Sequence, residues 1–156
     1  MSEPQQHTLR SEPAEPKIGV SVHHFPGTSL APAIIVQVTH LQDSYMVWAG
    51  TTESNSDAEA DVVAQIEQRG RLTRDWACAM PSIRELMPPA STSLFRSASS
   101  DIALPMSQRL ARRFKKQIVL SVDLPPPLSS LSNQGQVLLE MEKRLIEVLR
   151  AAEQTD

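Results

Sequence analysis

Residues 91–124 constrain the fold most strongly, because their hydrophobic period changes twice within one short stretch. Residues 91–95 can form a short strand, and Pro105 suits the first position of a helix. Three apolar residues then recur at helical spacing and predict a buried stripe: Met106, Leu110 and Phe114. In residues 117–124 every second side chain is apolar, which is typical of a half-buried strand. A strand, a helix and a strand in close succession predict a sheet with a helix packed on it.

The remaining periodicity completes the predicted architecture. Alternating apolar residues predict four further strands, at 18–25, 33–41, 45–49 and 72–80. Gln42 and Asp43 suit a two-residue turn, which requires the strands on either side to be antiparallel neighbours. A second helix is predicted over 132–152. The predicted fold class is α+β, a single domain with about six mainly antiparallel strands and two main helices.

The chain of 156 residues is long enough for one domain with a core and too short for two. Residues 1–17 are polar and proline-rich, so we expect a disordered N-terminal tail. The domain is predicted to span 18–152. Within it, 51–71 is expected to form an acidic inserted loop, and 125–131 a stiff proline-rich spacer.

Composition narrows the setting and the partners. The net charge of −3 argues against nucleic-acid binding through charge alone. Cys78 is the only cysteine, which excludes an intramolecular disulfide and favours a reducing compartment, so we expect a cytoplasmic or nuclear protein. No apolar run approaches membrane-spanning length, and the N-terminus lacks the apolar core of a signal peptide. We expect no membrane partner.

No candidate for chemistry outweighs a structural explanation. His23 and His24 are adjacent in a predicted strand, so they point to opposite faces and cannot chelate one ion together. Cys78 has no basic neighbour in sequence to activate it and is expected to be a buried, inert thiol. Ser44 lies in a turn with Asp43 but without a nucleophile-elbow motif. The sequence therefore predicts a protein that is not an enzyme and that holds no cofactor or metal.

One charged constellation stands out, on the predicted helix 105–116. Its cations recur at three- and four-residue spacing, on a face separate from the apolar stripe: Arg109, Arg112, Arg113 and Lys116. The cations fit a solvated surface, a nucleic-acid-binding module or scaffold, or a docking surface for an acidic protein. Against a base-stacking platform, Phe114 is the only aromatic residue of the helix and lies in its buried stripe.

A sheet with helices on one face needs a second cover if its other face is apolar. The strand 45–49 carries apolar residues on both sides, with Tyr45 and Val47 opposite Met46 and Trp48. We therefore expect a partner protein to cover one face of the sheet, and assign Tyr45 and Val47 to the contact.

Several short motifs share an order and spacing that point to one family. They are VSVHHF at 20–25, LQDSYMVWAG at 41–50, STSL at 91–94, QRLAR at 108–112 and the Lys116–Gln117 pair. Together with the strand that follows, these motifs resemble the proteasome assembly chaperone 4 family. The resemblance covers residues 18–50, then 74–124, and more loosely the final helix. The acidic segment, the proline spacer and the tail look like additions to the family pattern.

The resemblance implies a non-enzymatic chaperone for assembly of the 20S proteasome. It implies a heterodimer with proteasome assembly chaperone 3 that binds α-subunits, around the α5 subunit, and templates early α-ring formation. The cationic helix face, Arg109, Arg112, Arg113 and Lys116, is then one expected contact surface.

Overall fold

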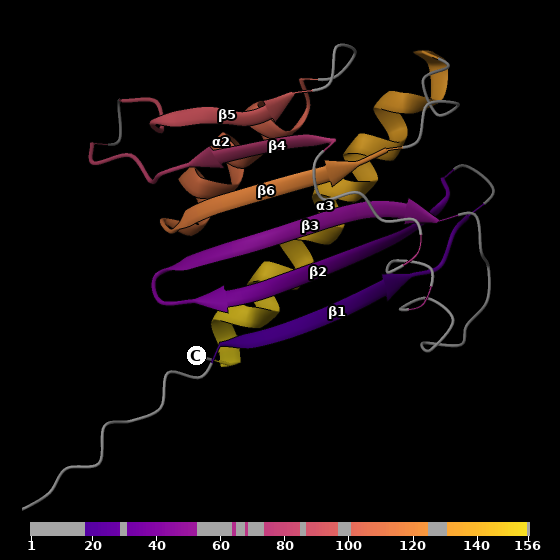
Figure 1. The fold of residues 1–156 in the computed structure, drawn as a ribbon, viewed down its shortest axis with the longest axis horizontal. Coiled ribbons are helices and arrows are strands. Elements are labelled where there is room, and N and C mark those ends of the chain that lie inside the picture. Colours follow the sequence, from indigo (N-terminus) through magenta and orange to yellow (C-terminus); the bar gives the residue numbers. More distant parts are fainter. Residues whose placement is uncertain are drawn as a thin grey trace, which may run out of the picture.

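The computed structural model describes residues 18–28, 31–52, 64, 68, 74–84, 87–96, 101–124 and 131–155. The predicted N-terminal tail, most of the predicted acidic loop and nearly all of the proline-rich spacer lie outside the described residues. What the structure describes is a sheet with two helices (Figure 1).

Six strands form one sheet. They are β1 (Gly19–Phe25), β2 (Ala33–Leu41), β3 (Ser44–Thr52), β4 (Asp75–Ala79), β5 (Ser91–Arg96) and β6 (Gln117–Asp123). Their order across the sheet is β1-β2-β3-β6-β4-β5. The β3–β6 pair is parallel, and the other four pairs are antiparallel. The predicted α+β class with a mainly antiparallel sheet is confirmed.

Helix α2 (Ala103–Phe114) explains why the last strand lies in the middle of the sheet. β5 and β6 both pair antiparallel with β4, so they run in the same direction and need a long crossover. Helix α2 supplies it, carrying the chain from β5 at the edge over β4 to β6. β6 thereby joins the β1–β2–β3 meander to the β4–β5 hairpin. Every second residue of β6 is fully buried beneath the helices: Ile118, Leu120 and Val122.

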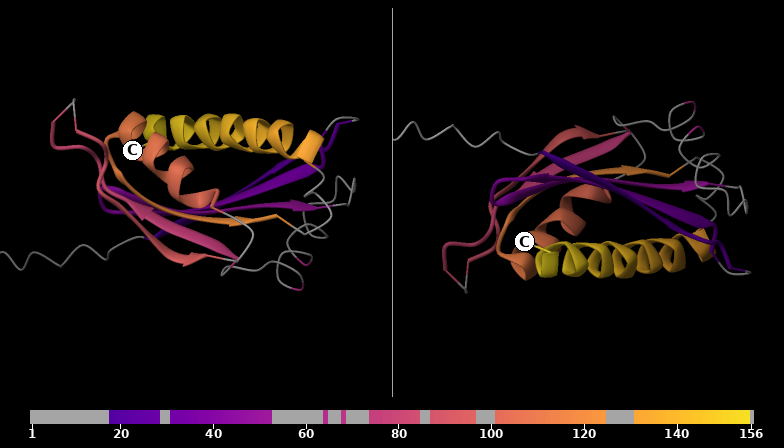
Figure 2. Two further views of the ribbon diagram at one scale, coloured as in Figure 1. Left: turned by 90° about the horizontal axis from the view of Figure 1, so that it is seen from above. Right: turned by 90° about the horizontal axis from the view of Figure 1, so that it is seen from below.

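Both helices cover the same face of the sheet (Figure 2). Helix α3 (Leu131–Thr155) runs past the end predicted from its apolar pattern. The main core lies between the helices and this face, where Leu110 of α2 and Leu145 of α3 meet Val36 of β2 and Val47 of β3. The predicted stripe of α2 is confirmed, since its three apolar members are buried.

The hairpin between β2 and β3 has the predicted two-residue turn. Leu41 and Ser44 are directly paired, which leaves Gln42 and Asp43 as the connection. Asp43 has φ of 54°, the left-handed conformation that aspartate tolerates better than most residues. The hairpin register is therefore set locally, and it fixes which residues of β2 and β3 share a face.

Two strand boundaries differ from the prediction. β3 continues through Thr52, into the start of the predicted acidic loop, because it stays paired with β2 up to Ala33. β4 is shorter than predicted, and Ala77 and Ala79 occupy its core-facing positions. Small residues there let α2 pack closely on β4. Cys78 consequently lies on the opposite face and is half-buried, so the expectation of a buried thiol was wrong.

Candidate partner-binding surfaces

Arg109 of α2 forms an ion pair with α3 within the chain. Its Nε and one terminal nitrogen donate to the two carboxylate oxygens of Glu142 on α3, each at 2.7 Å. The hydrogen bond to Glu142 raises the pKa of Arg109, against a smaller lowering by burial and with a further rise from the opposite charge. Arg109 therefore stays charged throughout the physiological range, and its guanidinium is engaged within the chain.

Lys116 is held by an aromatic ring. Helix α2 ends at Phe114, and Lys115 takes the left-handed conformation with φ of 55°, its N–H donating to Ala111 O at 3.0 Å. Lys116 thus follows the helix instead of extending its face. Its Nζ donates to Tyr45 Oη at 2.8 Å and lies 4.6 Å from the ring centroid. This contact combines a hydrogen bond with a cation–π interaction.

The predicted four-residue cationic face is therefore divided. Arg112 and Arg113 are exposed and form no ion pair within the described part of the chain, and the same holds for Lys115. Lys115 was absent from the predicted set, because helical spacing places it off the face. Lys115 is the left-handed C-cap residue of α2 and is exposed, as the two arginines are. We call Arg112, Arg113 and Lys115 the cationic cluster.

Tyr45 and Val47 do not lie where a partner would reach them. Both belong to the main core, and Tyr45 is only 1% exposed. Their register explains this, since Tyr45 pairs with Ile118 and Val47 with Leu120, the residues of β6 that face the helices. The assignment of these two residues to a partner contact is corrected: their face of the sheet is covered by the chain's own helices.

Neither α2 nor α3 lies on the opposite face of the sheet (Figure 2). Strand pairing arranges its side chains in two cross-strand rows, which we call the open face. One row is Val22, Gln37, Trp48, Ser121, Trp76 and Phe95, and the other is Val20, Thr39, Met46, Val119, Cys78 and Thr92. Both rows are largely apolar. Val20, at one edge of the sheet, is 59% exposed to solvent. The open face is the surface that most needs a cover.

Trp48 anchors the middle of the open face. It is 7% exposed and packs with Ile35 in a small cluster of their own. Gly50 makes this position possible, because a Cβ at residue 50 would come within 2.6 Å of the Trp48 ring. The ring therefore lies flat over the backbone of its own strand.

The other predicted candidates have local structural roles. His23 pairs with Val36 and His24 with Ile35, which confirms that the two histidines lie on opposite faces. His23 and His40 each lie 3.2 Å from Ser21 Oγ. No cluster of metal-ligating side chains occurs within the described ranges.

The two side chains considered for catalysis, Ser44 and Cys78, also form hydrogen bonds within the chain. Ser44 Oγ donates to Gln42 O at 3.2 Å within the turn. The Cys78 thiol accepts a hydrogen bond from Gln117 Nε2 at 3.3 Å.

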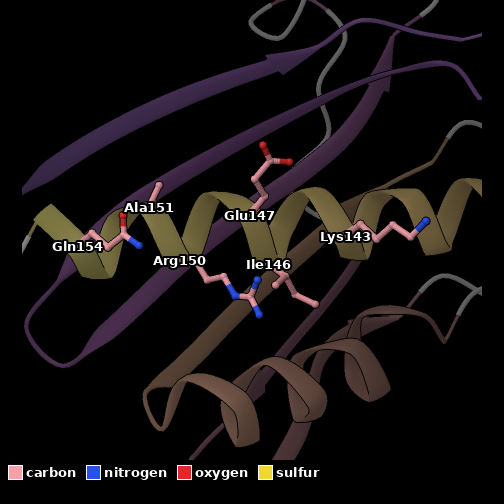
Figure 3. A pocket seen from close by; sticks show the side chains of 6 residues that line it. All are labelled: Lys143, Ile146, Glu147, Arg150, Ala151 and Gln154. Carbon is pink, nitrogen blue, oxygen red and sulfur yellow. The ribbon is translucent and has the colours of Figure 1, made fainter.

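A groove of about 410 Å³ follows the outer side of α3 (Figure 3). It is lined by Lys143, Ile146, Glu147, Arg150, Ala151 and Gln154. Glu147 accepts a hydrogen bond from Arg144 at 3.0 Å, and Lys143 lies 3.8 Å from Glu140. The lining is a stripe of one helix with mixed charge, a surface suited to protein contact more than to small-molecule chemistry. Neither α2 nor α3 has an apolar segment long enough to span a membrane.

The model of one protein family, described as proteasome assembly chaperone 4, matches residues 33–124, from the start of β2 to just after β6. This is more than half of the chain. The protein belongs to the proteasome assembly chaperone 4 family. The family resemblance inferred from the motifs is thus confirmed, and with it a role as a proteasome assembly chaperone.

The fold agrees with the family assignment. A solved structure described as the crystal structure of a novel chaperone complex for yeast 20S proteasome assembly contains a chain of similar fold. The TM-score is 0.55 at 16% identity, over 85% of this chain and 96% of that chain. The search of curated proteins found no match. In the described part of the chain, the open face and the cationic cluster are two candidate partner-binding surfaces.

Proposed function

We propose that this protein is a non-enzymatic chaperone that templates early α-ring formation of the 20S proteasome, as a heterodimer with proteasome assembly chaperone 3. The observation that carries the proposal is that this member of the family has helices on only one face of its described sheet. Its helices cover one face, while the other presents two apolar rows. The protein would act in the cytoplasm and nucleus.

The open face suits the heterodimer contact. Apolar area removed from water contributes roughly 25 cal/mol per Å², so covering two rows across six strands supplies a large driving force for association. Exposed members at both edges, Val20 on β1 and Phe95 on β5, extend the apolar surface over the full width of the sheet. A partner with its own one-sided sheet would complete a sandwich with helices outside.

The cationic cluster suits the α-subunit contact. Its three cations are exposed and form no ion pair within the described residues, so binding an acidic surface would break no ion pair seen there. Positive charge of this kind speeds encounter and fixes orientation more than it adds affinity. Because the cluster lies on the helix side, an α-subunit and the second chaperone would bind without competing. Holding α-subunits in order lowers the entropic cost of closing the ring.

The heterodimer is tested by mixing purified protein with proteasome assembly chaperone 3 and measuring the mass by light scattering. We expect a stable one-to-one complex. The double variant Val20→Glu/Val22→Glu places charge on the open face at exposed positions and should abolish the complex while the monomer stays folded. Leu139→Glu is the matched control, since Leu139 is 57% exposed on α3. A complex that survives the double variant would remove the open face from the proposal.

A further inference from the structure

We propose that the groove on the outer side of α3 is a docking site for an acidic amphipathic helix of another protein. The groove is lined by residues of α3, and α3 lies on the side of the sheet opposite the open face (Figure 2). A protein that covers the open face therefore leaves the groove accessible. The partner is defined by its chemistry, an apolar face that carries carboxylates spaced to meet two cations of α3.

Four residues form an outward stripe on α3, which we call the α3 stripe: Leu139, Lys143, Ile146 and Arg150. Their spacings of four, three and four residues place them on one side of the helix. Leu139 is 57% exposed and Ile146 is only partly buried, so the stripe carries apolar surface that the fold does not cover. Figure 3 shows Ile146 and Arg150 projecting to the same side of α3, away from Glu147. Apolar residues seven apart, each followed four residues later by a cation, are typical of a helix that packs on another helix.

The two cations of the α3 stripe keep most of their charge available for a partner. Arg144 binds both neighbouring acids, with its terminal nitrogens 2.9 Å from Glu140 Oε1 and 3.0 Å from Glu147 Oε2. Lys143 lies farther from Glu140, at 3.8 Å, and Arg150 forms no ion pair among the residues that the structure describes. The stripe is therefore positive although Glu147 also lines the groove, and the complementary surface is acidic.

The spacing of these cations selects a helix as the occupant. Lys143 and Arg150 are seven residues apart, which is about 10.5 Å along α3 at 1.5 Å per residue. A second helix laid along α3 presents two carboxylates at this distance, on one face, when they too are seven residues apart. In an extended segment about 10 Å corresponds to three residues, and side chains three residues apart point to opposite faces. An extended acidic segment therefore does not meet both cations with one face.

The charges of the α3 stripe disfavour a second copy of this chain as the occupant. If two α3 helices packed antiparallel about the middle of the stripe, Lys143 of each copy would face Arg150 of the other. In a parallel arrangement each cation would lie beside its own counterpart. The four residues of the stripe include no acid that would relieve either repulsion. The same charges attract a partner helix that bears carboxylates at the matching positions.

The probe is a fluorescently labelled, alanine-rich helical peptide with two Glu residues seven positions apart and Leu between them on the same face. Fluorescence anisotropy with the full chain measures its Kd at physiological salt, where charges more than about 8 Å apart are largely screened. A second peptide carries Lys in place of both Glu residues. We expect the wild type to bind the Glu peptide tighter than the Lys peptide by about tenfold or more. Lys143→Glu/Arg150→Glu should reverse this preference.

Two further variants separate the groove from positive charge in general. Ala151→Trp adds bulk to the lining without changing the charge, and should weaken binding of the Glu peptide by about tenfold or more. Because Ala151 is exposed, this variant should unfold at the wild-type temperature. Arg112→Glu/Arg113→Glu is the matched control, since it reverses the same number of exposed cations in the cationic cluster, and it should bind the Glu peptide like the wild type.

Each result decides for or against the groove. A wild type that binds neither peptide, or binds both equally, overturns the inference, and so does binding that survives Lys143→Glu/Arg150→Glu. Equal losses in that variant and in Arg112→Glu/Arg113→Glu would mean general electrostatic attraction, which also overturns it. Losses confined to the groove variants, with the preference for Glu or Lys reversed by the charge reversal, support it. The heterodimer and the α-subunit contact are tested separately, so they stand or fall on other measurements.

Discussion

The carboxylate of Asp75 lies 3.0 Å from the backbone nitrogen of Ala103, the first residue of α2. The same oxygen accepts the N–H of Ile102 at 2.7 Å. Ile102, at the N-cap position, makes no side-chain cap of its own. A buried acid on β4 thus caps a helix 28 residues away in sequence, satisfies two backbone donors and places negative charge at the positive end of the helix dipole.

Asp75→Ala should lower the free energy of unfolding by about 2 kcal/mol, because it removes two hydrogen bonds to a charged acceptor and a helix cap. Urea unfolding followed by circular dichroism measures the loss. Asp101→Ala is the control, since Asp101 lies beside the same helix start but is exposed and pairs with Arg96 rather than with the helix backbone among the described residues. Equal losses in the two variants would show that capping by Asp75 is unimportant.

Gly50→Ala should displace the Trp48 ring, since the new Cβ would lie 2.6 Å from it. We expect destabilisation of about 1–3 kcal/mol, the range for overpacking a tight contact. Trp48 fluorescence, recorded with Trp76→Phe in the background, should shift to the red as the ring becomes wetter. An unchanged emission maximum would contradict the close packing of ring and backbone.

Tyr45→Phe tests the Lys116 contact without changing the packing of the ring. The variant keeps the cation–π contact and loses the hydrogen bond from Lys116 Nζ, so we expect a cost of about 1 kcal/mol. Tyr45→Ala should cost about 3–5 kcal/mol, because it also opens a cavity in the core. Thermal unfolding of both variants distinguishes the polar contribution from the packing contribution, and similar losses would refute this division.

Leu145→Ala should destabilise the protein by about 2–5 kcal/mol, since Leu145 is fully buried where α3 packs on the sheet. Leu139→Ala, on the exposed side of the same helix, should change stability by no more than about 0.5 kcal/mol. Denaturant unfolding compares the two. A small loss at Leu145 would mean that α3 contributes little to the fold.

Arg112→Glu/Arg113→Glu should slow association with the α5 subunit about tenfold or more at low salt and leave the unfolding temperature unchanged. The difference from wild type should shrink as salt screens the charges. Arg150→Glu, which reverses an exposed cation on α3, is the control. Unchanged association in the double variant would remove the cationic cluster from the α-subunit contact. Generic, steeply salt-dependent binding of RNA or DNA by the wild type would instead favour a nucleic-acid-binding role.

Local sequence determined the elements and much of the candidate surface. The strict alternation in β6, the helical stripe of α2 and the two-residue turn at Asp43 each specify structure through residues close in the chain. The same locality made Arg112 and Arg113 recognisable as surface cations. The same local pattern grouped Arg112 and Arg113 with Arg109 and Lys116. The contacts that separate these two from the group, with Glu142 and Tyr45, are to residues distant in sequence.

Only the tertiary structure decided which face of each strand is covered. A period of two specifies two faces, and where both are apolar, as in β3, it does not say which one the helices will bury. That choice follows from the crossover of α2, which inserts β6 beside β3 and places Tyr45 and Val47 under the helices and Trp48 on the open face. The sequence alone determines the pattern of apolar residues, whereas long-range strand pairing, which depends on the path of the whole chain, assigns each of them to the core or to the open face.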